Sequence, residues 1–536
     1  MITQDLAEPA ARTAPAPVAP AVRPRRARRP AALIAVSSGV AVLLALPLAF
    51  LLIESGGAGL HQVTGLIVRP LTGELLWNTV QLTLAVTVLC AIIGTAAAWL
   101  VERTDLPGRR AWAVLLVVPL AIPDFVVSFG WASLWTWVHG FRGAVLVMTL
   151  AVYPLVYLPV AASLRSADPG QEEVARSLGC GRLRTFARVT LGQARGAILG
   201  GCLLVALVLL AEYGAFELLG YQTFTTEIFT EFHVSFSVAA ACALSLVLVG
   251  LSLLVLGGEG AARGRGRASR VGAGAQRVSP PLRLGRARWP VLAVLAALVA
   301  LALGMPVYSS IYWIFEGGIP SVTGGTVSML SATLHTAAYG AGAGLADTLA
   351  ALPVALLAVR HTSAARHFLE RSTYLVLAMP GAVIGFALAY FTEHYLGGRG
   401  YQTAPLLVLC YAIMFFPLAL VGVKAAVARA PASFDEVARS LGMSRLSTLR
   451  RVTLRLAGPG LAAAFCLVFL SVVTELTATL LLIPTGVQTL ATQFWQYETD
   501  LSYGQAAPFA LAMIAIAAVP SYVLGRFFDR SASARG

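Results

Sequence analysis

The sequence contains little charge and almost no lysine. Only 12% of its 536 residues are charged, whereas 58% are hydrophobic and the mean hydropathy is +0.78. Soluble domains carry about 25% charged residues, so the composition excludes an ordinary soluble fold and indicates a chain built for lipid. The single lysine, Lys424, precedes Ala425, whereas a phosphate-binding P-loop needs Lys followed by Ser or Thr. The chain therefore cannot hydrolyse ATP by itself, and we expect no catalytic residue in it.

Cysteine is scarce as well. Six cysteines are present, five of them within apolar runs and Cys180 in a basic segment. No pair has the CxxC arrangement or a spacing typical of metal ligands, so the sequence indicates neither a disulfide framework nor a cysteine metal site. We interpret the cysteines as small hydrophobic residues of helices. No cofactor is expected on this chain, and any other metal site stays undetermined.

Long apolar runs are what the sequence has in abundance. A transmembrane helix needs about 20 mainly apolar residues, and many stretches meet that length. Twelve spans are predicted, at about 31–53, 75–101, 111–138, 143–164, 196–219, 235–258, 290–315, 328–359, 371–391, 404–427, 458–483 and 506–526. The sequence therefore predicts an all-α membrane protein.

The basic residues lie mainly between these spans. With the amino terminus in the cytoplasm, all but Arg69, Arg142 and Arg399 fall on the cytoplasmic side, as the positive-inside rule requires. We therefore expect a multi-pass protein of the plasma (inner) membrane, in contact with lipid, with both termini cytoplasmic. The net charge of +14 follows from this topology, and we expect no nucleic-acid partner.

The predicted organisation has two similar membrane halves. It consists of a disordered basic tail (1–30), a first six-helix half (31–258), a Gly/Arg/Ser-rich cytoplasmic linker (259–289), a second six-helix half (290–526) and a short tail (527–536). Residues 173–191 read EVARSLGCGRLRTFARVTL and residues 436–454 read EVARSLGMSRLSTLRRVTL, identical at fourteen of nineteen positions. Six spans separate the two copies, so the repeats are parallel and predict a pseudo-two-fold axis along the membrane normal.

Each copy of this motif follows the fourth span of its half. The stretch EVARSL favours a short helix, and Gly179 or Gly442 is suited to end it in a left-handed conformation. A second amphipathic stretch then leads into the fifth span. The motif resembles the EAA loop of type I ABC importer permeases, with Val174 and Val437 in place of the family's first Ala, and without the family's Pro after the final Leu.

The resemblance implies a fold and partners. It implies the MetI-like permease fold, with separate ABC ATPase subunits, two in number, docking on the motifs and using ATP and Mg, and with an extracytoplasmic substrate-binding protein. The ATPase-coupling residues implied are Glu173, Ala175, Gly179, Glu436, Ala438 and Gly442. Two further stretches, AEYGAFELLGYQTFTTEIF and TELTATLLLIPTGVQTLATQFW, resemble fused ferric-iron permeases. Thiamine and polyamine permeases share much of this pattern and stay as alternatives, and a twelve-helix secondary transporter is the alternative from another class.

Four carboxylates lie within predicted spans. Burying such a group in a membrane is costly, so it indicates a functional site, here a translocation path formed by Glu212, Glu475, Asp124 and Asp347. Glu212 and Glu475 are related by the repeat, about two turns from the outer end of the fifth span of each half. The competing interpretation is that all four are hydrogen-bonding groups that hold helices together.

Overall fold

The computed structural model describes residues 31–57, 64–65, 67–167, 169–235, 237–263, 282–317, 326–360, 373 and 375–533. The predicted tail 1–30 and most of the predicted linker lie outside these residues. Within them the chain is helical, and the one strand-like pairing is an isolated bridge between Thr104 and Leu282. The all-α prediction is therefore confirmed.

The described residues of the first half form twelve α-helices. They are α1 (Ala31–Gly57), α3 (Pro70–Arg103), α4 (Arg109–Leu115), α5 (Asp124–Ala132), α6 (Gly140–Val152), α7 (Pro154–Ser166), α8 (Pro169–Ser177), α9 (Arg182–Thr185), α10 (Leu191–Ala211), α11 (Gly214–Leu218), α12 (Phe224–His233) and α13 (Val238–Arg263). A π-helical stretch, Phe186–Thr190, joins α9 to α10 without a break.

The second half follows the same order. Its helices in the described residues are α14 (Arg288–Val299), α15 (Met305–Glu316), α17 (Thr326–Arg360), α19 (Gly381–Tyr395), α20 (Ala404–Ala428), α21 (Ala432–Ser440), α22 (Arg445–Thr448), α23 (Leu454–Val473), α24 (Thr477–Leu482), α25 (Leu490–Thr499) and α26 (Tyr503–Ser533). A second π-helical stretch, Leu449–Thr453, occupies the repeat-equivalent position before α23. The missing family proline thus leaves both helices into the fifth span continuous.

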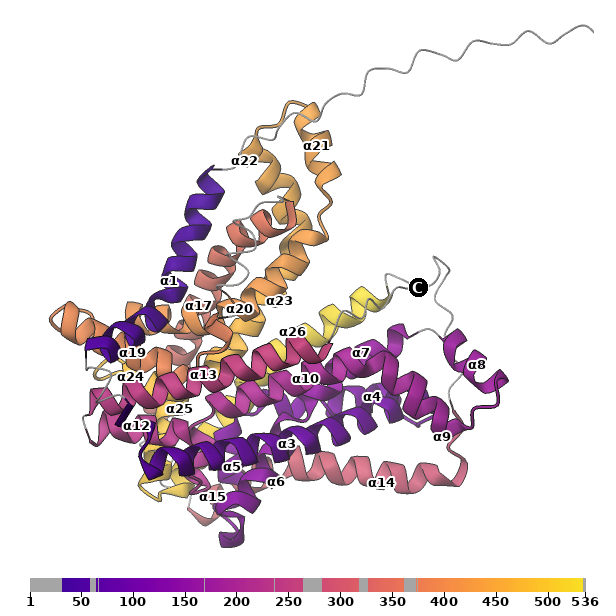
Figure 1. Cartoon of the computed structure of the whole chain (residues 1–536), viewed down its shortest axis with the longest axis horizontal. Coiled ribbons are helices and arrows are strands. Elements are labelled where there is room, and N and C mark those ends of the chain that lie inside the picture. The colour runs from indigo at the N-terminus through magenta and orange to yellow at the C-terminus, as the bar shows by residue number, and fades with distance from the viewer. Residues whose placement is uncertain are drawn as a thin grey trace, which may run out of the picture.

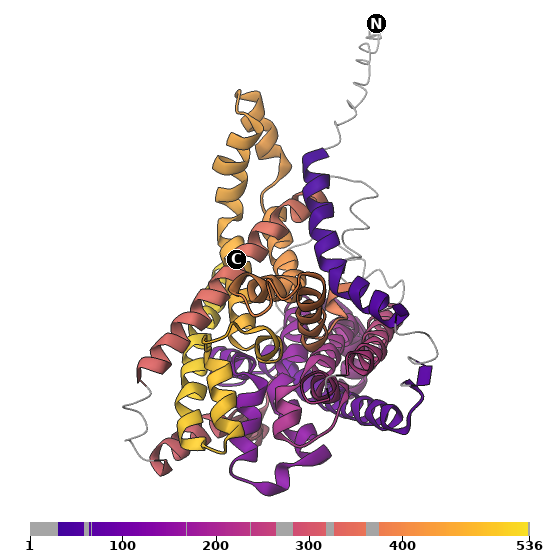
Figure 2. The ribbon, with the colours of Figure 1, turned by 90° about the vertical axis from the view of Figure 1, so that its left-hand side faces the viewer.

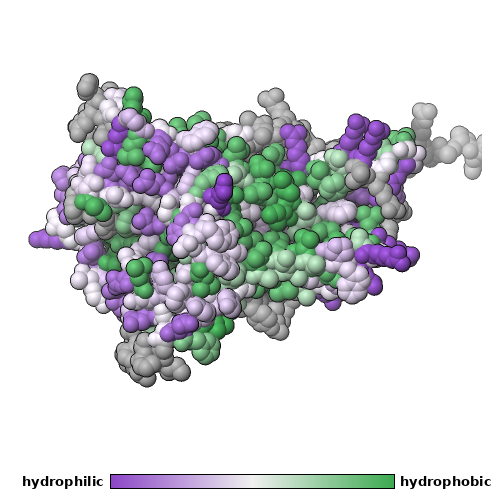
Figure 3. Space-filling model, turned by 90° about the horizontal axis from the view of Figure 1, so that it is seen from below, coloured by the Kyte–Doolittle hydropathy of each residue, from purple (hydrophilic) through white to green (hydrophobic). Residues whose placement is uncertain are grey.

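Nine helices of the described chain are long and apolar enough to cross a membrane, or ten if one bent pair is counted as a span. The nine match nine of the twelve predicted spans. Of the predicted ninth and twelfth spans, the described residues contain α19 and an apolar helix of shorter length, Tyr503–Ala518. Figure 3 shows the corresponding surface, where hydrophobic side chains gather between hydrophilic residues at the two ends of the view.

Three predicted spans differ from the structure. The third predicted span, 111–138, is a pair of helices bent by 89° between Ala121 and Asp124, where Pro119 and Pro123 cannot donate the backbone hydrogen bonds of a straight helix. The fifth span of each half ends earlier than predicted, at Ala211 and at Val473, and the short helices α11 and α24 follow. The apolar run continues through these breaks, so hydropathy alone did not reveal them.

The first span of each half packs against the other half. Helix α1 contacts α17 and α19, and α15 contacts α5, so closely that a Cβ on Gly130 would lie 2.7 Å from the Pro306 backbone. Figures 1 and 2 show the indigo α1 lying along the orange second half. This exchange interlocks the halves, and each of the two hydrophobic cores contains residues from both.

Candidate functional site

The two copies of the repeated motif fold into the same unit. Helices α8 and α21 end at Ser177 and Ser440, two residues before Gly179 and Gly442, which both have φ +83°. Beyond each glycine the next residue's N–H donates to a carbonyl five residues back, Cys180 to Ala175 at 3.0 Å and Met443 to Ala438 at 3.1 Å. This pattern is a Schellman cap, so the predicted left-handed glycine ends are confirmed.

The outward face of each unit is apolar at its tip. Val174 and Leu178 are 58% and 78% exposed, and their repeat mates Val437 and Leu441 are 57% and 78% exposed. Glu173 and Glu436 are exposed beside them, Ala175 is half-buried and Ala438 is buried. Apolar side chains held in the open at equivalent positions indicate a surface for a partner. In Figure 1, α21 and α8 lie at the tips of two arms that point in different directions.

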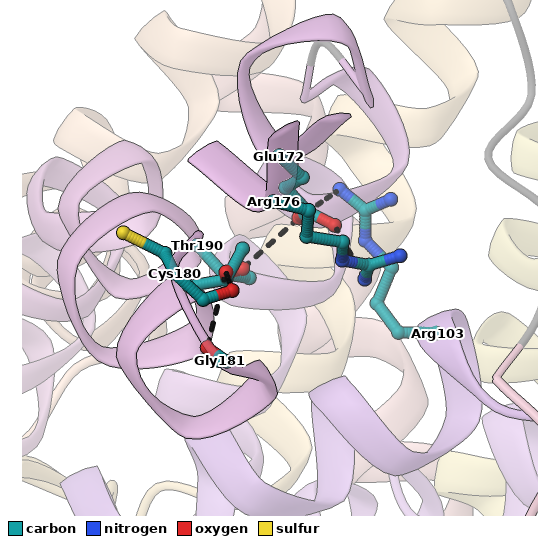
Figure 4. Close-up of polar contacts among 7 residues, drawn as sticks. Arg103, Glu172, Arg176, Cys180, Gly181 and Thr190 are labelled. Carbon is teal, nitrogen blue, oxygen red and sulfur yellow. Dashed lines mark hydrogen bonds and ion pairs between the residues drawn. The ribbon is translucent and has the colours of Figure 1, made fainter. Parts of the chain in front are cut away.

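A buried polar contact ties each unit to the bundle. In the first half, Thr190 Oγ1 donates to Glu172 Oε1 at 2.9 Å, and Arg103 Nη2 lies 3.4 Å from the same oxygen. Figure 4 shows these side chains converging from α3, α8 and the start of the fifth span, with Arg176 also near Glu172.

The second half repeats this contact. Thr453 Oγ1 donates to Asp435 Oδ1 at 3.0 Å, and Arg360 forms an ion pair with Asp435. Neither set was predicted from the sequence, although the aligned repeats, in which Glu172 falls on Asp435 and Thr190 on Thr453, carried the signal.

The two repeat-related glutamates lie two residues before the short helices that follow the fifth spans. Glu212 Oε1 accepts a hydrogen bond from the Ala215 N–H at 2.8 Å, and Glu475 Oε1 accepts one from the Ala478 N–H at 3.0 Å. Each carboxylate therefore satisfies a free N–H at a helix start. The glutamates lie just beyond the ends of α10 and α23 and not two turns inside the fifth span.

Three of the four predicted path carboxylates come together. A Cβ on Gly214, two residues after Glu212, would lie 3.1 Å from Phe125 and 2.7 Å from Leu476, the residues that follow Asp124 and Glu475. Asp347 does not join them; it is fully buried on α17, and neither carboxylate oxygen has a hydrogen-bond partner in the part of the chain that the structure describes. The predicted group of four is thus a group of three and a separate aspartate.

The centre of the molecule is closely packed around these carboxylates. Beside Glu475 lies a cavity of about 10 Å³, lined also by Thr336, Tyr339, Tyr411, Val472, Val473, Thr489 and Ala491, which is no larger than one water. Rings from both halves meet nearby, with Tyr213 and Trp495 5.7 Å apart and Phe125 and Phe494 5.5 Å apart. In the described residues no three His, Cys, Asp or Glu side chains are arranged to hold a metal ion.

A symmetric hydrogen bond holds the helices that follow. The Phe224 N–H, at the start of α12, donates to Thr79 Oγ1 at 3.3 Å, and the Leu490 N–H, at the start of α25, donates to Thr336 Oγ1 at 2.9 Å. Thr79 and Thr336 occupy equivalent positions on the second span of each half. The second span of each half therefore contacts the motif helix at one end and the start of α12 or α25 at the other end.

The fold and the duplicated loops define a class of protein, a membrane permease of two fused units. The family model of the binding-protein-dependent transport system inner membrane component matches residues 92–258 and 348–534, and the chain belongs to this family. It is therefore a membrane permease subunit of an ABC transport system.

Individual relatives show which permeases the chain is similar to. The chain is 35% identical over 486 residues to the Fe(3+)-transport system permease protein FbpB 2 of Haemophilus influenzae, covering 90% of this chain and 96% of that protein. Shorter matches include the molybdenum transport system permease protein ModB of Escherichia coli, 30% identical over 26% of this chain and 69% of that protein. The sulfate transport system permease protein CysW of the same species is 28% identical over 33% of this chain and 65% of that protein.

Proposed function

We propose that this chain is the transmembrane subunit of a ferric-iron importer of the inner membrane. The observation that carries the proposal is the 35% identity to a Fe(3+)-transport permease over nearly the full length of both chains. In this proposal a substrate-binding protein delivers iron to the outer end, and two ATPase subunits dock on α8 and α21 and use ATP and Mg. Ferric iron crosses as substrate.

The acidic residues at the centre support a cationic substrate. When ionised, Asp124, Glu212 and Glu475 would repel molybdate or sulfate, which the shorter relatives are named for, whereas they would attract a cation released from a binding protein. Thiamine and polyamines are also cationic, and they stay as the second candidates. A secondary transporter is disfavoured because the duplicated apolar tips would then lack a partner.

The substrate assignment is tested by accumulation in the native host. A strain lacking the gene should take up several-fold less radiolabelled ferric iron than its parent, and unchanged amounts of labelled thiamine, putrescine and molybdate. Loss of thiamine or polyamine uptake instead would correct the substrate and leave the permease class intact.

The proposed orientation places both motifs and both termini in the cytoplasm. Cys180, within the first copy of the motif, is partly exposed, and it can be made the only cysteine by replacing the other five. We expect an impermeant thiol reagent to label it in inverted membranes and to leave it unlabelled in intact cells. If the reagent labelled Cys180 only in intact cells, the orientation would be the opposite of the one proposed.

A further inference from the structure

The acidic side chains Glu172 and Asp435 lie on α8 and α21, one position before the exposed glutamates of the motif. Glu172 is 8% exposed and Asp435 is 7% exposed. On α8, Glu172 is the only buried side chain among those the structure describes, and on α21 Asp435 shares that role with Ala438 alone. Each helix therefore buries one carboxylate against the bundle.

Each carboxylate is held by two different spans. Its arginine partner, Arg103 or Arg360, is the last residue of the second-span helix α3 or α17. Its threonine partner, Thr190 or Thr453, is the last residue of the π-helical stretch that opens the fifth span. Such stretches are rare and occur often at functional positions. The contact therefore joins three elements at one point.

Both halves form this contact of arginine, carboxylate and threonine, although the acidic residue differs between them. The first half uses Glu and the second uses Asp, yet both accept a hydrogen bond from the threonine, at 2.9 and 3.0 Å, and both pair with the arginine. By contrast, the exposed hydrogen bond from Gln193 to Gln171 has no counterpart, because Leu456 and Phe434 stand at the equivalent positions. Shared geometry in spite of a changed side chain indicates that the contact itself is what both halves need.

We propose that the Arg103–Glu172–Thr190 and Arg360–Asp435–Thr453 contacts are positioning clamps that pass movement of α8 and α21 to the second and fifth spans together. The inference rests on the proposed function, since it takes the ATPases to move these helices. A helix held only by its flanking loops would swing without moving the spans, whereas a buried charge pair resists separation because each charge would be left unpaired. The second spans also carry Thr79 and Thr336, which hold the starts of α12 and α25 by hydrogen bonds. Movement of the second spans therefore reaches the end of the bundle opposite the motifs.

The test compares coupling with docking in the full transporter, reconstituted in vesicles with its ATPase and binding protein. The double variant Glu172→Gln with Asp435→Asn removes both charges. We expect it to retain bound ATPase and to hydrolyse several-fold more ATP per iron imported than the parent. The exchange Glu172→Asp with Asp435→Glu gives each half the acid of the other, and we expect it to restore the parental ratio. Gln193→Ala is the matched control and should leave the ratio unchanged.

Two results would overturn the clamp. One is a parental ratio of ATP to iron in the charge-free double variant, and the other is a ratio that the Asp/Glu exchange fails to restore. If the double variant does not reach the membrane, each single variant should raise the ratio by a smaller factor, and two normal single variants contradict the proposal. Absence of bound ATPase from the parent protein would instead contradict the proposed function.

Discussion

At the scale of single residues, Glu212 and Glu475 combine a structural contact with a charge. One oxygen of each accepts a hydrogen bond from a backbone N–H at the start of a short helix, which supports the interpretation as structural groups. Their place in one region with Asp124, where Gly214 packs against Phe125 and Leu476, suits a path for cations. The sequence predicted that the pair is related by the repeat. It did not predict the capping, because a cap depends on where the helix breaks, and the apolar run conceals the break.

The two roles of the pair separate by substitution. Glu212→Gln with Glu475→Gln keeps an amide oxygen to accept the backbone N–H but removes both charges, so we expect lower iron uptake at an unchanged unfolding temperature. Glu212→Ala with Glu475→Ala also removes the caps, at about 0.5–2 kcal/mol each, so uptake and unfolding temperature should both fall. Uptake equal to the parent's in the Gln variant would leave the pair with a structural role alone.

Glu498 is a titratable group outside the membrane-length helices. Burial, together with the charge of Glu217, raises the pKa of Glu498 to about 7. Because the pKa is raised in the folded state, stability falls as pH rises from the ordinary glutamate range to about 7. Glu498→Gln should therefore raise the unfolding temperature at about pH 8 and leave it unchanged near pH 4. A stabilisation that is the same at both values would contradict the assigned cause.

At the scale of elements, the repeated loop could be predicted almost completely. Its helix, its glycine end and the helix into the fifth span all follow from local sequence, because capping and amphipathic pattern are local properties. The bend at Pro123 and the partners of Glu172 could not be predicted in the same way. They depend on which spans pack together, and one sequence does not give that information.

The prediction at the scale of elements concerns Gly179 and Gly442, the glycines that follow α8 and α21. A branched side chain at φ +83° is strained by about 1–2 kcal/mol, so Gly179→Val with Gly442→Val should displace the apolar tips and release the ATPase during purification. Either single variant should retain part of it. Gly181→Ala is the control, since a Cβ there meets nothing within 4 Å. Full retention of the ATPase by the double Val variant would remove the docking role from these loops.

At the scale of the whole molecule, the fold joins two arms to one closely packed centre. The exchange of α1 and of α14–α15 between halves makes the two units one body, and this exchange was not predictable from the spans alone. The parallel arrangement of the two repeats was predictable, because the motif recurs after six spans. In the proposed function, ATPases act at the arms and a cation passes the centre, and the spans between them transmit movement.

The central claim is that this chain imports ferric iron when separate ATPases act on it. The most direct measurement is uptake of radiolabelled ferric iron into vesicles that contain the purified full chain and its ATPase, with iron-loaded binding protein on one side and ATP on the motif side. The account predicts accumulation that requires ATP, the binding protein and the ATPase together. Iron accumulation that proceeds without ATP, or ATP hydrolysis that the iron-loaded binding protein stimulates without any iron transport, would contradict it.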